Sequence, residues 1–360
     1  MNIGYFISSH GFGHAARACA VMEKLSINPD IKFTIFTKTP KWFFDNSLTF
    51  DYQYVYSQTD IGLIQSTPFL EDLDKTLLEL KALFPFPKQL ISLLENNVIQ
   101  EKISIIISDI SPVGLQIAKN LNIPSILIEN FTWDWIYESY LEQNPEFGYY
   151  ISLLQEVYNS ATIRITCEPF CKKSDHSTIV SPIFREPRNG KEEIKRKLGI
   201  SNEGKIILIS MGGIPIEKMK KSMNDPNQGY TFIIPVGESA GSQSQHNIIY
   251  LPHNHTFFHP DLVNASDLIV GKVGYSTIAE TYSLRKPFLY VGRKKFRESK
   301  ILEEYIQENL ISEPIEFEDI FTIDFYNKIQ NIIRNKDKKF TPINGADQVC
   351  EIITKEFLTK

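Results

Sequence analysis

Residues 3–25 read IGYFISSHGFGHAARACAVMEKL and join an apolar run, a glycine-containing turn and a stretch with helical spacing. The apolar run Ile3–Ile7 predicts a buried strand, and Ala15–Leu25 predicts a helix. A strand that breaks at glycines and continues as a helix leaves backbone N–H groups at the carboxyl edge of a sheet, where open α/β folds bind ligands. This segment therefore predicts an α/β fold with a ligand site at its first turn.

The alternation of strand and helix recurs along the 360-residue chain. Residues 31–37 (IKFTIFT) alternate in polarity, so residues 3–37 predict a βαβ unit, which implies a parallel sheet. Leucines at helical spacing predict one helix over residues 70–94. Apolar runs predict further strands at 103–109, 124–130, 163–167, 205–211, 231–236, 247–251, 268–271 and 287–291.

Two α/β halves each open with a strand that runs into glycines, the second at residues 205–213 (KIILISMGG). This repetition predicts two Rossmann-like domains whose parallel sheets face a cleft. The first domain is expected at residues 1–180 and the second at 204–344, with a proline-containing linker at 181–203. A last helix is expected within residues 345–360.

The composition narrows the possible partners and location. A net charge of −5 argues against nucleic acid as a partner, because a large footprint on nucleic acid needs a basic surface. The four cysteines form no CxxC pair, which fits a reducing, cytoplasmic compartment, and no signal peptide is expected. No apolar run approaches the roughly 18–20 residues of a transmembrane segment. The stretch 83–87 (LFPFP) leaves peripheral membrane contact open, although a packed, proline-bounded loop is the better interpretation.

The first turn matches a cofactor fingerprint incompletely. Residues 11–16 (GFGHAA) fit the relaxed dinucleotide pattern G-x-G-x-x-G/A. That pattern also needs an acid about 20 residues further on, at the end of the second strand, to bind ribose hydroxyls. Here the second strand ends Phe36-Thr37-Lys38-Thr39, without an acid. We therefore predict neither NAD nor FAD, and no other cofactor.

Two histidines, His10 and His14, flank the glycines Gly11 and Gly13 of the turn. A histidine titrates near neutral pH and can act as a general base if it faces a hydroxyl group in the cleft. The alternative is that one or both cap the helix or fill a polar corner.

Polar and aromatic residues follow the next predicted strands. Asp109 ends one strand, and Asn130, Trp133 and Asp134 follow another, so all four are expected at the same edge as His14. Aromatic rings beside carboxylates and amides suit a sugar, whose C–H faces stack on rings and whose hydroxyls find polar partners. The alternative is that the tryptophan packs between the loop and the sheet.

Residues 271–280 (GKVGYSTIAE) form the strongest ligand-binding pattern in the second half. Glycines let the backbone approach a ligand, and hydroxyls at the start of a helix join its N–H donors and dipole to bind a phosphate. The predicted donor-binding residues here are Gly271, Lys272, Gly274, Ser276, Thr277 and, toward a ribose, Glu280. The alternative is a capping box, because Thr277-x-x-Glu280 fits that motif. Gly212 and Gly213 form a second candidate phosphate turn.

Three histidines, His253, His255 and His259, suggest a metal at first sight. Their spacing is loose, however, and no H-E-x-x-H motif lies nearby. We therefore predict no metal, and interpret these residues as a polar loop that lines the cleft.

Several motifs together resemble a known family. Residues 10–17 (HGFGHAAR) resemble the G-x-G-H-x-x-R turn of GT-B glycosyltransferases related to MurG and monogalactosyldiacylglycerol synthase, and residues 276–280 resemble their donor-nucleotide motif. A closer resemblance is to the glycosyltransferase-like N-terminal region of plant L-arabinokinases, over about the first 300 residues. It rests on residues 10–17, 108–114 (SDISPVG), 130–140 (NFTWDWIYESY), 212–213 (GG), 265–277 (ASDLIVGKVGYST) and 286–293 (KPFLYVGR).

The resemblance implies a GT-B glycosyltransferase with a UDP-linked nucleotide-sugar donor and an unidentified acceptor hydroxyl. It implies that His14 is the catalytic base, and Asp109 is assigned to the catalytic group with it. No bound divalent metal is implied, and the last helix is implied to cross back onto the first domain. The diphosphate of the donor would lie on Gly212, Gly213, Gly274, Ser276 and Thr277, with the ribose on Glu280.

Two other activities stay open on the same fold. The G-x-G-H-x-x-R turn also occurs in hydrolases that cleave the sugar from UDP, so a nucleotide-sugar hydrolase or epimerase is one alternative. The other is a non-catalytic nucleotide-sugar binding module, as the fused arrangement in arabinokinases permits. No sugar-kinase motif follows residue 300.

Overall fold

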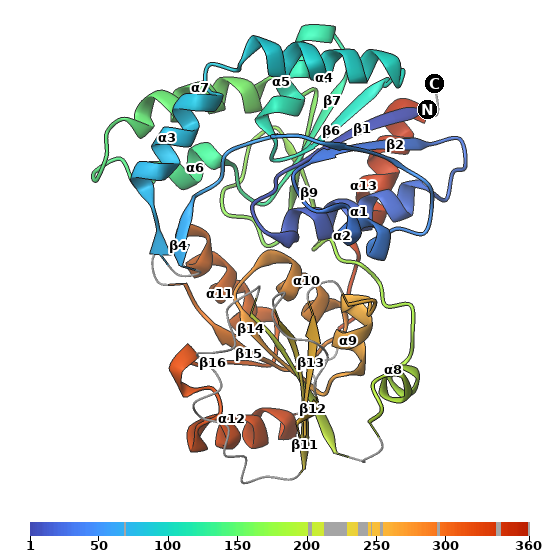
Figure 1. Cartoon of the computed structure of the whole chain (residues 1–360), viewed down its shortest axis with the longest axis vertical. Helices are drawn as coiled ribbons and strands as arrows, with labels where there is room; N and C mark the ends of the chain where they lie inside the picture. The colour runs from blue at the N-terminus through green and yellow to red at the C-terminus, as the bar shows by residue number, and fades with distance from the viewer. Residues whose placement is uncertain are drawn as a thin grey trace. The chain divides into compact units, whose positions relative to one another are not determined.

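The computed structural model describes residues 1–67, 70–200, 204–211, 229–236, 244–245, 247–252, 255–293, 296–335 and 340–358 (Figure 1). The chain divides into two compact units. Unit 1 consists of Met1–Phe184 and Asn344–Lys360, and unit 2 is Arg185–Ile343. The predicted linker, 181–203, therefore holds both the end of the first segment of unit 1 and the start of unit 2.

Unit 1 is built on a seven-stranded parallel sheet with the order β3-β2-β1-β6-β7-β8-β9. Every residue of the central strands β6 and β7 is buried, which accounts for their continuous apolar runs. The strands are β1 (Asn2–Ile7), β2 (Lys32–Thr37), β3 (Gln53–Tyr56), β6 (Ile105–Asp109), β7 (Ser125–Glu129), β8 (Ile163–Cys167) and β9 (Ser177–Val180). A separate pair, β4 (Gln65–Thr67) and β5 (Leu70–Glu71), is antiparallel.

Helices connect most of these parallel strands, whereas β8 and β9 are joined without a helix. They are α1 (Phe12–Leu25), α2 (Lys41–Ser47), α3 (Leu73–Leu83), α4 (Lys88–Gln100), α5 (Pro112–Leu121), α6 (Trp133–Glu138) and α7 (Phe147–Asn159). The prediction of one helix over residues 70–94 is wrong, because Pro85 and Pro87 separate α3 from α4. Leu83, the last residue of α3, and Phe84 after it are buried, whereas Pro85 is exposed.

Unit 2 repeats the architecture with the strand order β12-β13-β11-β10-β14-β15-β16. All pairs are parallel except β12 with β13. The strands are β10 (Lys205–Ser210), β11 (Tyr230–Val236), β12 (Ser244–Gln245), β13 (Ile248–Pro252), β14 (Leu268–Lys272), β15 (Phe288–Val291) and β16 (Ser312–Pro314). The helices are α8 (Lys191–Lys197), α9 (His259–Ala265), α10 (Tyr275–Ser283), α11 (Arg297–Asn309) and α12 (Ile323–Arg334), with a 3-10 turn at Phe317–Asp319. The predicted α/β class with two parallel sheets is confirmed.

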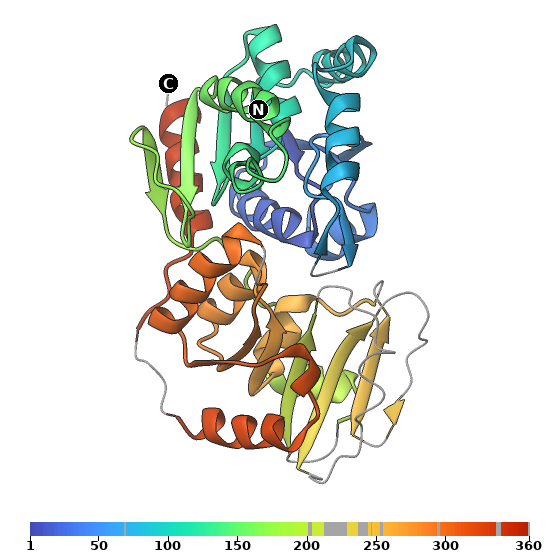
Figure 2. The same cartoon turned by 90° about the vertical axis from the view of Figure 1, so that its left-hand side faces the viewer.

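The C-terminal helix α13 (Gly345–Ile353), which continues as a π-helical turn over Thr354–Leu358, packs on α1 of unit 1 and beside β9 (Figure 2). Lys24 of α1 forms an ion pair with Asp347 at 2.9 Å, and the Gly345 N–H donates to the Pro182 carbonyl at 2.9 Å. Unit 1 is therefore completed by residues that follow the whole of unit 2 in sequence.

Candidate active site

The first turn lies where the strand order of the unit 1 sheet reverses. From β1 the sheet runs through β2 to β3 on one side and through β6 to β7 on the other. At such a switch point the loops after two neighbouring strands diverge and leave room for a ligand at the carboxyl edge. Ile7 pairs with Asp109 across these strands. Gly11, with φ of 79°, adopts a conformation that favours glycine, and α1 begins at the next residue.

His14 and Asp109 come from the two elements that flank this reversal. His14 Nδ1 lies 2.8 Å from Asp109 Oδ1, and His14 is 7% exposed while Asp109 is fully buried. Because a carboxylate oxygen can only accept, we assign the proton of neutral His14 to Nδ1, which donates it to Asp109. Nε2 then carries a lone pair, as a general base requires. The structure thus brings the two predicted catalytic residues into contact.

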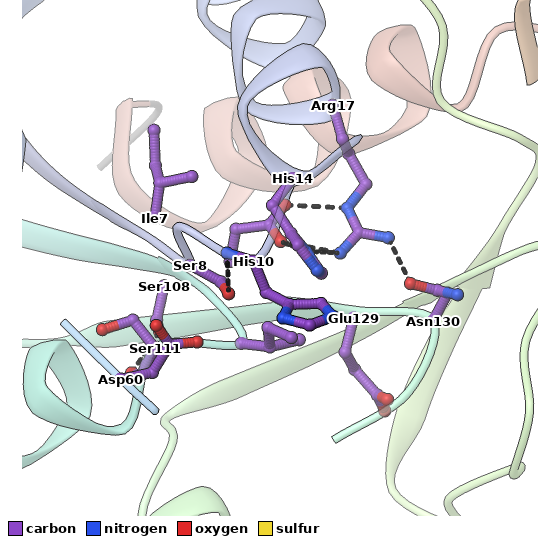
Figure 3. A network of polar contacts seen from close by, with 12 residues as sticks. Ile7, Ser8, His10, His14, Arg17, Asp60, Ser108, Ser111, Glu129 and Asn130 are labelled. Atoms are coloured by element: carbon purple, nitrogen blue, oxygen red, sulfur yellow. Dashed lines mark hydrogen bonds and ion pairs between the residues drawn. The ribbon is translucent and has the colours of Figure 1, made fainter. Parts of the chain in front are cut away.

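Arg17, in the next turn of α1, binds the same carboxylate, and Figure 3 shows its side chain reaching Asn130. Its Nε donates to Asp109 Oδ2 and its Nη2 to Asp109 Oδ1, both at 2.7 Å. Its Nη1 donates to Asn130 Oδ1 at 2.7 Å and to Cys167 Sγ at 3.3 Å. Burial by itself raises the pKa of Asp109, but the charge of Arg17 and hydrogen bonds from Arg17 and His14 outweigh it and hold this pKa below its usual value.

A second buried carboxylate, Asp60, lies at the same turn and was not predicted. Its Oδ2 accepts a hydrogen bond from Trp133 Nε1 at 2.7 Å. Burial raises the pKa of Asp60, although hydrogen bonds from Ser8 and Trp133 oppose this. The Trp133 ring in turn meets His10 edge-on, with 5.0 Å between the ring centroids. The stretch 57–63 (SQTDIGL) carries no motif, so the sequence held no signal that could have identified Asp60.

The predicted acceptor-side residues differ in how far they are exposed in the structure. His10, Gly11 and Gly13 keep exposed surface at the turn. Asn130 is buried and its Oδ1 is bound by Arg17. Trp133 is also fully buried, so its indole supports His10 and presents no open face.

Asp134, the last of the predicted acceptor-side residues, lies in the first turn of α6. It is 8% exposed, and burial raises its pKa. Its role in binding a sugar stays a prediction, as do the roles of the other acceptor-side residues.

In unit 2, Glu280 is the centre of a second polar network. Its Oε1 accepts from Arg185 Nε at 3.0 Å and Nη2 at 2.8 Å, and its Oε2 lies 2.7 Å from His259 Nδ1. His259 Nε2 lies 3.2 Å from Ser210 Oγ at the end of β10. Burial raises the pKa of Glu280, but Arg185 and His259 overcome it and lower that pKa overall. Neither Arg185 nor Ser210 was predicted.

The predicted phosphate turn precedes α10. The N-cap of this helix is Gly274, so Ser276 and Thr277 lie in its first turn, where phosphate ligands bind. The capping-box alternative is wrong, because Thr277 would have to be the N-cap and Glu280 instead binds Arg185 and His259.

Gly271 and Lys272 end the strand that leads into this turn. A Cβ on Gly271 would lie 3.1 Å from the carbonyl oxygen of Ser210, its partner on β10, so glycine here suits the packing of the two strands. Burial and the nearby charge of Arg293 lower the pKa of Lys272 to about 8. Gly212 and Gly213 lie outside the described residues.

A metal site has no support in the described parts of the chain, where no three His, Cys, Asp or Glu side chains gather as ligands would. His259 binds Glu280 instead, and His253 lies outside the described ranges. That the protein uses no metal stays a prediction. No helix in these ranges is both long and apolar enough to cross a bilayer.

Sequence comparison finds relatives among sugar-transferring and sugar-phosphorylating enzymes. A family model described as glycosyl transferase family 1 matches residues 1–324. The chain is 25% identical over 320 residues to the L-arabinokinase of Arabidopsis thaliana, covering 84% of this chain and 29% of the kinase. It is 27% identical over 200 residues to a UDP-N-acetylglucosamine–N-acetylmuramyl-(pentapeptide) pyrophosphoryl-undecaprenol N-acetylglucosamine transferase of Clostridium botulinum, covering 51% and 56%. The chain thus spans less than two thirds of the length of these relatives.

Solved structures resemble the whole chain. A UDP-glucosyltransferase of Polygonum tinctorium superposes with a TM-score of 0.64 at 13% identity, covering 100% of this chain and 99% of that one. The calicheamicin glycosyltransferase gives 0.62 at 10% identity, covering 99% and 94%. MurG of Acinetobacter baumannii gives 0.54 at 13% identity, covering 98% and 99%. At such low identities these likenesses show the fold, which is GT-B. With most of its length matched by the family model, the chain belongs to glycosyl transferase family 1.

Proposed function

We propose that this protein is a metal-independent glycosyltransferase that moves a sugar from a UDP-linked donor to an acceptor hydroxyl, with His14 as the base. The observation that carries the proposal is the 2.8 Å contact between His14 Nδ1 and Asp109 Oδ1 at the switch point of the unit 1 sheet. Membership of glycosyl transferase family 1 supports sugar transfer as the reaction class.

In the proposed reaction, His14 Nε2 takes the proton of the acceptor hydroxyl as its oxygen attacks the anomeric carbon of the donor. The bond between that carbon and the diphosphate oxygen breaks, and the diphosphate leaves with the electron pair. The imidazolium that forms keeps its Nδ1 proton directed at Asp109, whose negative charge stabilises it. Asp109 itself exchanges no proton with the acceptor, because it is fully buried.

Unit 2 would hold the donor. We assign the diphosphate to the N-terminus of α10 with Ser276 and Thr277, and to the backbone at Gly271 and Gly274. Lys272, with a pKa lowered to about 8, still carries its positive charge on most molecules at neutral pH and would offset the charge of the leaving group in place of a metal.

We assign the ribose to Glu280, as the sequence motif suggests. Oε1 of Glu280 accepts two hydrogen bonds from Arg185, whereas Oε2 accepts one from His259 and keeps a lone pair that can accept another. Because Glu280 is 2% exposed, a ribose would reach Oε2 along the side of His259, whose side chain is 25% exposed.

A screen of UDP-, GDP-, CDP- and dTDP-sugars by thermal shift tests the donor. A donor at about 100 times its dissociation constant should stabilise the protein by about 2.7 kcal/mol, and the UDP-sugars are expected to give the largest shift. No shift with any of them would count against the donor site.

Release of UDP from the sugar that binds then separates the activities. Release that depends on an added acceptor supports transfer. Release without any acceptor supports the hydrolase alternative, and binding without release supports the non-catalytic module. A cytoplasmic location and peripheral membrane contact stay predictions.

A further inference from the structure

Arg17 is the most heavily bonded side chain of the unit 1 site, and no role was predicted for it. It is 1% exposed and donates to Asp109, Asn130 and Cys167 from all three of its nitrogens. A guanidinium stays protonated in proteins, so burying it requires a carboxylate close by. Asp109 supplies that carboxylate with two bonds of 2.7 Å, an arrangement that fixes the carboxylate plane.

The positions of the donors decide which nitrogen of His14 carries the proton. Arg17 Nη2 and His14 Nδ1 both lie against Asp109 Oδ1, at 2.7 Å and 2.8 Å, and 3.2 Å from each other. Two nitrogens that donate to the same oxygen lie close together for that reason alone, so the 3.2 Å between them does not require a hydrogen bond from one to the other. The alternative, in which Nδ1 accepts from Arg17, would place its lone pair 2.8 Å from an oxygen that can only accept. The geometry therefore favours the tautomer with Nδ1 protonated.

Charge balance gives Arg17 a second effect. With Asp109 ionised and His14 neutral, Arg17 and Asp109 together carry no net charge. If Arg17 were absent, the negative charge of Asp109 would act on His14 without compensation and favour the imidazolium, which has no lone pair for catalysis. Asp60, whose carboxyl group also interacts with His14, would act in the same direction when ionised. The pair would then retain one more proton up to a higher pH, whichever of the two residues held it.

We propose that Arg17 is a positioning residue for sugar transfer: it orients Asp109, fixes the His14 tautomer and balances the negative charge of Asp109 beside His14. This inference rests on the proposed role of His14 as the base. Arg17 contacts neither substrate in this scheme, because it is only 1% exposed. Its effect on the reaction passes entirely through His14 and Asp109.

The test compares Arg17→Met, which removes the charge, with Arg17→Lys, which keeps it. Cys167→Ser is the matched control, because Cys167 Sγ accepts from Arg17 Nη1 whereas Asp109 is bound by Nε and Nη2, and serine keeps a group that can accept from Nη1. In Arg17→Met the acid limb of the pH–rate profile should move up by about 1–3 pH units, so that activity lost near neutral pH returns at higher pH. In Arg17→Lys and Cys167→Ser it should stay within about 0.5 unit of wild type.

Asp109→Asn should move the acid limb of the pH–rate profile to lower pH, because the positive charge of Arg17 then acts on His14 without the compensating charge of Asp109. An equal loss of kcat at every pH in Arg17→Met would overturn the proposal and leave Arg17 a structural role alone. The same holds if Arg17→Lys shifts the limb as far as Arg17→Met.

A measurement on the unsubstituted protein avoids the risk that Arg17→Met fails to fold. The ¹⁵N shifts of the His14 ring, recorded without any donor, report which nitrogen is protonated. Protonation of Nδ1 in neutral His14 is expected, and protonation of Nε2 would overturn the proposal. Because this readout needs no turnover, it distinguishes failure of this inference from failure of the transferase assignment. A protein with the expected tautomer but no UDP release would contradict only the latter.

Discussion

The indole N–H of Trp133 donates to Oδ2 of Asp60 at 2.7 Å, and neither residue has more than 1% of its surface exposed. This contact links the loop after β3 to the start of α6, and the indole edge then supports His10 at the first turn. Asp60 thus shapes the wall of the turn at an electrostatic cost, since burial raises its pKa.

We expect Asp60→Asn to be more stable than wild type at pH 8. The pKa of Asp60 in the folded protein is raised above 3.8, the ordinary value for an aspartate, so folding favours the protonated form. The stability of the wild-type protein therefore falls as the pH rises from about 3.8 through the folded pKa. Asparagine can still accept from Trp133 and avoids this loss. Thermal melts at pH 4 and pH 8 should show a gain that shrinks toward pH 4. Asp45→Asn is the control, and it should be less stable than wild type at pH 8, because the pKa of Asp45 is lowered. An Asp60→Asn variant that is less stable than wild type at pH 8 would contradict this explanation.

His14→Gln should reduce transfer by about 10²–10⁴-fold and leave donor affinity unchanged, because the donor is assigned to unit 2 and the base to unit 1. Initial rates and thermal shifts with the donor measure the two effects separately. His176→Gln, at an exposed histidine of the same unit, is the control and should behave as wild type. Undiminished transfer in His14→Gln would remove His14 from the mechanism.

Replacement of Glu280 by glutamine should destabilise unit 2 and flatten its response to acid. The pKa of Glu280 is lowered from 4.5, so its contribution is complete above about pH 4.5 and disappears as the pH falls through the lowered folded pKa. Loss of the charge leaves Arg185 buried without its carboxylate, at a cost of about 3–5 kcal/mol. Denaturant melts between pH 3 and pH 7 measure both effects, with exposed Glu192→Gln as the control. Equal acid sensitivity in wild type and Glu280→Gln would refute this interpretation.

Gly345→Ala should weaken the attachment of α13, because its Cβ would lie 2.0 Å from the Ser181 carbonyl oxygen. Gly148→Ala in α7 is the matched control, since its Cβ would have an ordinary contact at 3.7 Å. The control should be neutral or more stable by up to about 1 kcal/mol, as alanine favours helix. Hydrogen exchange of α1 and α13 distinguishes local detachment from general unfolding. Similar melting temperatures for both variants would mean that backbone shifts absorb the clash.

The parts of the fold that depend on local pattern could be predicted from the sequence. Apolar runs such as 103–109 become strands because both faces of a parallel sheet are buried. The glycines of the first turn likewise mark the place where strand β1 ends and helix α1 begins. Short elements with mixed composition, such as β9 and β16, carry no comparable pattern. The break between α3 and α4 was readable from Pro85, but the leucine spacing on both sides suggested continuity.

The site was less predictable because its contacts join distant segments. Arg17 lies three residues after His14, so its place on the same helix face could be expected, yet its partner Asp109 is 92 residues away. Asp60 and Trp133 are 73 residues apart, and no motif marks the loop that carries Asp60. Glu280 fits a capping motif that requires Thr277 as the N-cap, but the N-cap of α10 is Gly274, three residues earlier.

The return of α13 to unit 1 also affects how the chain folds as it is synthesised. Residues 1–184 leave the ribosome first, but α1 lacks the helix that packs on it until residues 344–358 emerge. At about 5–20 residues per second, translation of residues 185–343 takes on the order of ten seconds, during which the α13-binding face of α1 is uncovered. Unit 2, whose segment is continuous, can fold within that interval, so the unit that carries His14 is the last to be completed.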